Sequence, residues 1–221
     1  MRSINLAWLQ EAARHRHLFR QEWLGERFFH LPGDVVALQH LFWQVRPEVA
    51  VLTGIAAGGG PILAASMLDL LGGAGAVIAI DPVVRPEVRA RFATHPHAGR
   101  IELVESSTIH DATFAYVRDR IGGRGPVMVV LDHDHTHVHV LRELELYSTL
   151  VSPGSYLIVL DTIMEDLPED YFAGRPYGKG NNPATALRAF LAKDDRFEVD
   201  HDIEDRVLMT LAPGGFLRRA R

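Results

Sequence analysis

Short apolar runs alternate with amphipathic stretches over most of the chain. Five mostly apolar runs span 50–53, 76–80, 101–104, 127–131 and 156–160. The amphipathic stretches between them lie at 61–71, 86–93, 111–121 and 137–150. Apolar runs without polar alternation are typical of strands in a sheet that is covered on both faces. Because these runs alternate with stretches of helical spacing, the pattern predicts βαβ units in a parallel sheet.

The two ends of the chain follow other patterns. Residues 4–28 and 34–44 have helical spacing of apolar positions. Near the other end, a predicted helix at 184–191 is followed by apolar runs at 197–200 and 207–211. Only about five residues separate these two runs, whereas a parallel crossover needs roughly a dozen. We therefore predict that they pair as an antiparallel hairpin.

The whole pattern predicts an α/β fold of the Rossmann-like type. We expect a mostly parallel, seven-stranded sheet with a C-terminal antiparallel hairpin and N-terminal helices, which is the strand inventory of the class I methyltransferase fold. We expect residues 1–45 to form a helical extension and residues 46–221 to form the Rossmann-like domain.

Composition and charge narrow the classes of partner. The formal net charge of -5 argues against a nucleic-acid partner, because binding to phosphates needs a basic surface. No apolar run reaches the ~18 residues that span a bilayer, and the absence of cysteine excludes disulfides and thiolate chemistry. We expect a cytoplasmic protein with a small-molecule substrate and neither a membrane nor a nucleic-acid partner. Aromatic residues in the N-terminal helices leave a homo-oligomer open.

A glycine-rich segment begins at Thr53, directly after the first predicted strand. Gly54, Gly58 and Gly59 would let the backbone turn tightly and approach a ligand. Asp81 ends the second strand, where an acid can accept hydrogen bonds from both hydroxyls of a ribose. Together these residues predict a nucleoside site. The alternative is a tight strand-to-helix turn without a ligand, in which the acid caps the next turn.

Carboxylates and imidazoles follow the fourth and fifth strands. Asp132 and Asp161 would lie at neighbouring strand ends, about 5 Å apart. Two carboxylates this close repel each other, and a shared divalent cation relieves the repulsion. Oxygen ligands favour Mg²⁺ over zinc. Among the histidines of segment 133–139, we expect His135 to move a proton. The alternative is that both carboxylates cap loops and point to water.

The segment 174–183 is rich in Gly, Pro and Asn and follows the fifth strand at the same edge of the sheet. It could close over the site as a lid or substrate clamp, with Tyr177, Asn181 and Asn182 as substrate contacts. The alternative is a surface loop that caps the helix after it.

Together, these motifs resemble the bacterial family named for cephalosporin hydroxylase and rhamnosyl O-methyltransferase. The matching stretches are 47–61, 77–81, 129–132, 135–137, 143–162, 175–183 and 212–217. The likeness covers roughly residues 20–219, and its most specific parts are the block around Asp132 and the Gly-Asn-Asn-Pro loop. It implies the class I methyltransferase fold and a role mainly in natural-product biosynthesis.

The resemblance also implies S-adenosylmethionine (SAM) and a divalent metal as cofactors. SAM would lie near Thr53, Gly54, Gly58, Gly59, Asp81, Ser106, Asp132 and His133. The metal would lie near Asp132 and Asp161, and His135 falls where similar catechol-type O-methyltransferases can place a basic residue. The chain departs from the family pattern at Leu52 and Leu160, where an acid is usual. These departures remove a partner for the SAM ammonium group and a metal ligand.

Our main hypothesis is SAM-dependent, metal-assisted methyl transfer to a hydroxyl of a small molecule or sugar, with Asp132 and Asp161 on the metal and His135 taking the proton. Leu52 motivates a second hypothesis, a repurposed enzyme such as a hydroxylase component, lyase or cyclase with weak or no use of SAM. A third is a non-catalytic partner subunit. A fourth, a nicotinamide dehydrogenase, fits the terminal hairpin and the imperfect glycine fingerprint less well.

Overall fold

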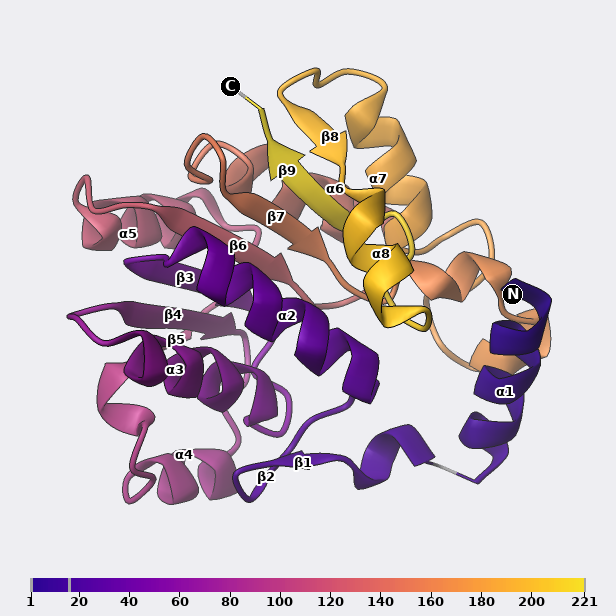
Figure 1. Ribbon diagram of the computed structural model, residues 1–221, viewed down its shortest axis with the longest axis horizontal. Helices are drawn as coiled ribbons and strands as arrows, with labels where there is room; N and C mark the ends of the chain where they lie inside the picture. The colour runs from indigo at the N-terminus through magenta and orange to yellow at the C-terminus, as the bar shows by residue number, and fades with distance from the viewer. Residues whose placement is uncertain (1, 16, 221) are drawn as a thin grey trace.

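The computed structural model describes residues 2–15 and 17–220, and a seven-stranded sheet lies at its centre (Figure 1). The strands, in their order across the sheet, are β5 (Ile101–Glu105), β4 (Ala76–Asp81), β3 (Val49–Thr53), β6 (Val127–Leu131), β7 (Tyr156–Val159), β9 (Phe216–Arg219) and β8 (Phe197–Val199). Strands β3 to β7 pair in parallel, and β9 pairs antiparallel with both β7 and β8. The predicted fold class is therefore confirmed.

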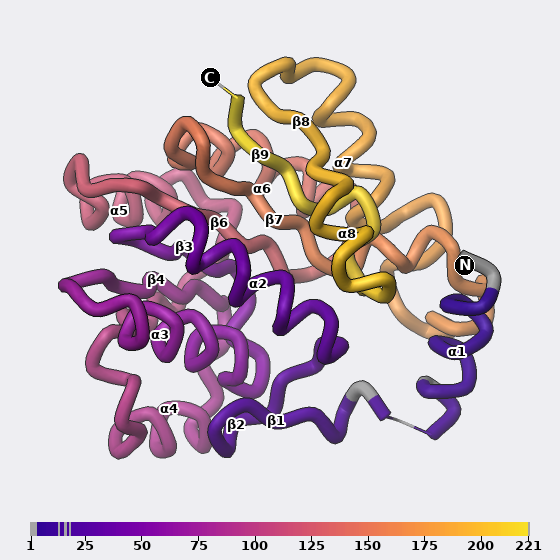
Figure 2. Tube along the Cα trace, in the orientation of Figure 1, coloured from indigo at the N-terminus to yellow at the C-terminus, as the bar shows by residue number. Residues whose placement is uncertain are grey.

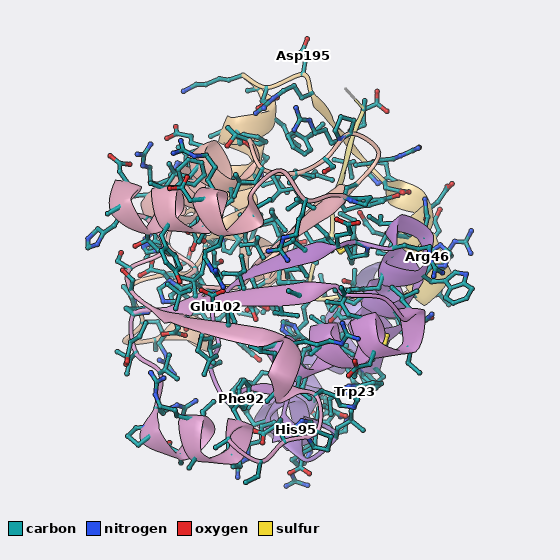
Figure 3. The ribbon with its side chains drawn as sticks, turned by 90° about the vertical axis from the view of Figure 1, so that its left-hand side faces the viewer. Trp23, Arg46, Phe92, His95, Glu102 and Asp195 are labelled. Atoms are coloured by element: carbon teal, nitrogen blue, oxygen red, sulfur yellow. The ribbon has the colours of Figure 1, made fainter. Side chains whose placement is uncertain are left out.

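Helices cover both faces of the sheet, as the unbroken apolar runs require. They are α2 (Pro32–Val45), α3 (Gly59–Leu71), α4 (Pro86–Phe92), α5 (Asp111–Ile121), α6 (His137–Tyr147) and α7 (Pro183–Leu191). Successive residues of β3 serve the two faces in turn: Ala50 and Leu52 belong to the cluster beneath α2 and α3, and Val49 and Val51 to the cluster beneath α5 and α6. Figure 3 shows the sheet between helices on its two sides.

The predicted central strands agree with the structure to within one residue at each end. Helix α5 has the predicted bounds, and α2 ends where Arg46 adopts a left-handed conformation before Pro47. Short 3-10 helices complete the connections: η2 (Ala98–Arg100), η3 (Thr162–Asp166) and η4 (Glu169–Phe172). Within the described ranges, no helix combines the length and apolar character that crossing a bilayer demands.

The helix predicted at residues 4–28 is only partly correct. The segment forms α1 (Arg2–Arg14), a 3-10 helix η1 (His17–Arg20) and a small hairpin of β1 (Glu22–Trp23) and β2 (Glu26–Arg27); residue 16 lies outside the described residues. The hairpin turns at Leu24 and Gly25, which both have positive φ angles. A glycine in the left-handed region reverses the chain easily, and it ends the helical spacing here.

The strand predicted at 207–211 is wrong. Asp200 caps a helix, α8 (His201–Val207), by accepting a hydrogen bond from the amide of Asp202, and the last strand follows only at β9. The terminal strands are antiparallel as predicted, but a helix and a loop join them instead of a tight turn. Gly215 permits this pairing, because a Cβ there would lie 2.1 Å from the carbonyl oxygen of Val159.

The N-terminal segment packs at the carboxyl ends of the strands. Leu9 of α1 and Leu31 share a buried cluster with Ile163, Leu167 and Leu211. Figure 2 follows this segment from α1 across to the hairpin and α2, beside the segment that leaves β7. The division into an extension and a domain after residue 45 stays a prediction, since α2 also contributes to the main core.

Asp34 provides a test of how the N-terminal segment is anchored. Its buried carboxylate accepts hydrogen bonds from the amides of Leu31 and Leu211 and from the hydroxyl of Thr210. We expect Asp34→Ala to lower the free energy of unfolding by about 3 kcal/mol, because it leaves buried donors unpaired. Urea denaturation measures this. The control is Asp195→Ala at an exposed loop tip (Figure 3), and equal stability of the two variants would contradict the expectation.

Candidate active site

The loops that follow β3 and β6 lie in direct contact. The amide of Asp132 donates to the carbonyl oxygen of Thr53 (3.1 Å) and approaches its hydroxyl (3.3 Å). Gly54 has a φ of 89°, and a Cβ at that position would lie 2.2 Å from the carbonyl oxygen of Asp132. Glycine is thus required here so that the backbone carrying Asp132 can approach β3.

The other two predicted glycines contact protein. A Cβ on Gly59 would lie 2.3 Å from the carbonyl oxygen of Arg27 in β2, and one on Gly58 would lie 2.8 Å from the ring of Phe92. Figure 3 labels Phe92 and His95 at the same end of the molecule as Trp23 of β1. Packing of the N-terminal hairpin against Gly59 and of Phe92 from α4 against Gly58 therefore accounts for both glycines without a ligand.

Asp81 organises the same loop. Its Oδ2 accepts hydrogen bonds from the amides of Ile55 (2.9 Å) and Ala56 (3.4 Å), and its Oδ1 accepts one from Val83 (3.0 Å). The capping role that the sequence left as an alternative is present. Ser106, on the neighbouring strand end, donates its amide to the Asp81 carbonyl oxygen, so the two predicted cofactor residues are adjacent.

The structure brings Asp132, His135 and Asp161 together. One potential ligand atom from each lies within 4.8 Å of the others, and Nε2 of His135 is 3.7 Å from Oδ2 of Asp161. Burial raises the pKa of Asp161; His135 opposes this shift, and the carboxylate of Asp132 adds to it. His133 belongs to a different group, with its Nδ1 3.2 Å from Nε2 of His139.

His30 is a site residue that the sequence prediction missed. It is 4% exposed, and its Nε2 lies 3.0 Å from Oδ2 of Asp132. Burial alone would lower the pKa of His30, but the carboxylate of Asp132, with Asp161 and Asp34, raises it to about 9. In the sequence, His30 is a single histidine within an apolar stretch before Pro32. The residues around it give no indication of a partner about a hundred residues away.

The 174–183 loop contributes Tyr177 to the site. Its ring centroid lies 5.2 Å from that of His135 in an edge-on arrangement. Asn181 accepts a hydrogen bond from the amide of His137, which fixes the loop against the start of α6. Asn182 is fully buried: it caps α7 by accepting from the amide of Thr185, and its amide group donates to Glu165. The loop thus caps the next helix, as the alternative interpretation stated, and Tyr177 faces the site.

Leu52 and Leu160 line a small cavity beside Asp132. Phe42 and Leu38 of α2 line it too, and its volume is about 20 Å³. Both leucines are almost fully buried, with 5% and 3% exposure. A carboxylate at either position would lie against apolar side chains of α2, which explains why leucine suits these positions in this chain.

Sequence comparisons identify relatives of this chain. A family model described as Rhamnosyl O-methyltransferase/CmcI matches residues 15–220. The rhamnosyl O-methyltransferase of Mycobacterium bovis (strain BCG / Pasteur 1173P2) is 29% identical over 198 residues, which cover 85% of this chain and 73% of that protein. The rhamnosyl O-methyltransferase of Mycobacterium leprae (strain TN) is 25% identical over 202 residues, with coverages of 89% and 82%.

Solved structures show the same fold. A structure of CmcI with Mg-SAM matches with a TM-score of 0.64 at 20% identity, over 92% of this chain and 78% of that chain. MycE methyltransferase from the mycinamycin biosynthetic pathway, in complex with Mg, SAH and mycinamycin VI, matches with a TM-score of 0.53 at 16% identity, over 80% and 45%. These matches confirm the predicted class I methyltransferase fold.

The pairing of His30 with Asp132 predicts a pH dependence of stability. Because the pKa of His30 is raised from 6.5 to about 9 on folding, its contribution is complete below pH 6.5 and is lost as the pH rises through about 9. In chelator-treated protein, the stability difference between wild type and His30→Gln should fall by about 3 kcal/mol over that range. Urea denaturation at several pH values measures it.

His15→Gln, at an exposed histidine, is the control and should show no such trend. A stability difference that stays constant with pH would contradict the prediction. It would mean that His30 stays neutral in the folded protein. The neutral form leaves Nδ1 without a proton, which suits a buried Nδ1 that has no hydrogen-bond partner among the described residues.

Proposed function

The chain belongs to the rhamnosyl O-methyltransferase/CmcI family and is a methyltransferase, and we propose that it transfers the methyl group of SAM to a hydroxyl of a sugar or small natural product with the help of a divalent cation. The observation that carries this proposal is the convergence of Asp132, His135 and Asp161 at the carboxyl ends of two adjacent parallel strands. The relatives named rhamnosyl O-methyltransferase support a sugar as the methyl acceptor, and MycE supports natural-product biosynthesis.

The carboxylates suit a divalent cation. Asp132 and Asp161 offer oxygen ligands, which Mg²⁺ prefers, and their mutual repulsion is what a cation would relieve. A cation held there would supply positive charge that lowers the pKa of an acceptor hydroxyl. Asp132 also has a hydrogen-bond partner in His30, which fixes the orientation of its carboxylate.

The loop after β3 suits the nucleoside part of SAM, which brings a methyl group on a positively charged sulfur. Asp81 is partly exposed and holds the loop amides of Ile55 and Ala56 in place. Each carboxylate oxygen can accept two hydrogen bonds, so Oδ1 can take a ribose hydroxyl beside the amide of Val83. Ser106 lies next to Asp81 at the adjacent strand end, where it can contact the base.

His135 takes the proton in this proposal. Its Nε2 faces Asp161, and its ring packs against Tyr177, so the imidazole is held beside the carboxylates. The acceptor oxygen would gain the methyl group while its proton passes to Nε2 of His135. Holding the two reacting groups in line supplies much of the rate enhancement, because effective molarities can reach ~10⁵ M.

An aromatic row leads away from His135 and suits the acceptor. Tyr177 contacts Phe172 with ring centroids 5.7 Å apart, and Phe172 contacts Tyr171 at 4.9 Å. Burial raises the pKa of Tyr171, and the charge of Asp161 adds to this rise, so the row lies within the electrostatic reach of the carboxylates. Aromatic faces and edges bind the apolar C–H surfaces of sugars and small ring systems.

A second candidate function rests on Leu52 and Leu160. Because both residues line an apolar cavity with α2, neither position offers a charge to the SAM ammonium group or to a metal. This favours, as the alternative, an enzyme of the same fold that has been turned to another reaction with weak or no use of SAM.

Replacing Asp132 separates the two functions. We expect Asp132→Asn to lower kcat by more than about 100-fold while SAM binding stays within a few-fold of wild type, because the change removes a cation ligand and spares the loop after β3. SAH release with a panel of rhamnosides and small hydroxylated acceptors measures turnover, and calorimetry measures SAM binding. Asp195→Asn is the matched control.

Unchanged turnover in Asp132→Asn would remove the metal role. A wild-type protein that gives no heat with SAM would instead favour the repurposed enzyme. The two failures are therefore distinguishable.

Tyr177→Ala tests the acceptor side. Loss of the ring should raise KM for the acceptor by about tenfold and leave the Kd for SAM unchanged, because the contact lies on the aromatic row. Steady-state kinetics with a rhamnoside acceptor measures the change. Tyr116→Ala, at an exposed tyrosine on α5, is the control, and an equal effect of both variants would count against this role.

A further inference from the structure

Glu143 on α6 is a buried carboxylate that lacks hydrogen-bond donors around it in the described part of the chain. Its side chain is 0% exposed, and neither oxygen has a hydrogen-bond partner among the described residues. Nε2 of His139, one helical turn earlier, lies 3.6 Å from Oε1, which is beyond hydrogen-bond distance. An uncompensated buried charge costs several kcal/mol, so this position calls for a positive partner.

Nε2 of His139 has more polar neighbours than it can form hydrogen bonds with. Nδ1 of His133 lies 3.2 Å from it, the hydroxyl of Thr108 lies 2.8 Å from it, and Oε1 of Glu143 lies 3.6 Å from it. A ring nitrogen carries either one proton or one lone pair, so it cannot satisfy all three groups. A cation placed among His133, His139 and Glu143 would accept a lone pair from each.

We propose that His133, His139 and Glu143 form a second metal site, which takes a transition metal such as Zn²⁺ and is separate from the Asp132–Asp161 site. Potential ligand atoms of the three residues lie within 4.8 Å of one another. Two imidazoles and one glutamate form a donor set that zinc takes in proteins, whereas the oxygen-rich pair at Asp132 and Asp161 suits Mg²⁺. The two sites therefore differ in the metal that they select.

Neighbouring groups support the ligands. The carboxylate of Asp134 lies 3.7 Å from Nδ1 of His139, the side of the ring that faces away from Glu143. A carboxylate on that side favours the proton at Nδ1 and leaves Nε2 free to bind a metal. The metal would also tie α6 to the loop after β6, because His133 belongs to that loop whereas His139 and Glu143 belong to the helix. A metal that joins a loop to a helix in this way would have a structural role.

Metal titration of the full chain tests this site. Chelator-treated protein in excess Mg²⁺ should bind about one equivalent of Zn²⁺ by calorimetry. Glu143→Gln should weaken that affinity by at least about tenfold, and Glu145→Gln, at a half-exposed glutamate of the same helix, should leave it unchanged. The double variant Asp132→Asn/Asp161→Asn should still bind Zn²⁺ as wild type does. His133→Gln serves as the second variant if Glu143→Gln fails to fold.

Two results would overturn the proposal. One is a wild-type protein that binds no Zn²⁺, in which case a protonated His139 is the counter-ion of Glu143. The other is Zn²⁺ binding that disappears in Asp132→Asn/Asp161→Asn and persists in Glu143→Gln, which would place the zinc at the first site. X-ray absorption of the zinc-loaded protein should show imidazole nitrogens at about 2.0 Å, and a shell of oxygen alone would equally refute the site.

Discussion

Repulsion between two neighbouring carboxylates is the constraint on which the rest of the site depends. Asp132 and Asp161 stand at adjacent strand ends where burial already disfavours a charged Asp161. The imidazole of His30 compensates part of this charge by bonding to Asp132, and Nε2 of His135 lies 3.7 Å from Oδ2 of Asp161. Because His30 comes from the N-terminal segment, that segment completes the site as well as packing against it. A bound cation would act where this compensation is weakest, between the two carboxylates.

The backbone and the core hold these charges at fixed positions. Gly54 permits the loop after β6 to lie against β3, and the buried leucines Leu52 and Leu160 lie directly beneath the site. Apolar groups there exclude water, which strengthens each electrostatic interaction above them. Both leucines stand where the family resemblance predicted an acid, so this pair of residues makes the site less charged and lines the apolar cavity beneath α2.

Predictions from the sequence succeeded where a pattern is local and failed where a partner is distant. Buried parallel strands need unbroken apolar runs, and this is why β6 was predicted to the residue. The run at 207–211 is equally apolar but belongs to the end of α8 and a loop, because Asp200 caps a helix before it. Strand β9 was missed because its apolar run is only two residues long: Phe216 and Leu217 are buried, and Arg218 and Arg219 follow them directly. The pairing of His30 with Asp132 has no local signature at all.

One backbone turn explains how a single histidine-rich segment contributes to two different groups of potential metal ligands. Asp134 and His135 have φ angles of 60° and 66°, a conformation that costs non-glycine residues energy. The turn separates His135, which joins Asp132 and Asp161, from His133 and His139, which join Glu143. In an extended chain, residues 133 and 135 would point to the same side. The strained turn therefore allows the oxygen-rich group at Asp132 and Asp161 and the nitrogen-rich group at His133 and His139 to form next to each other.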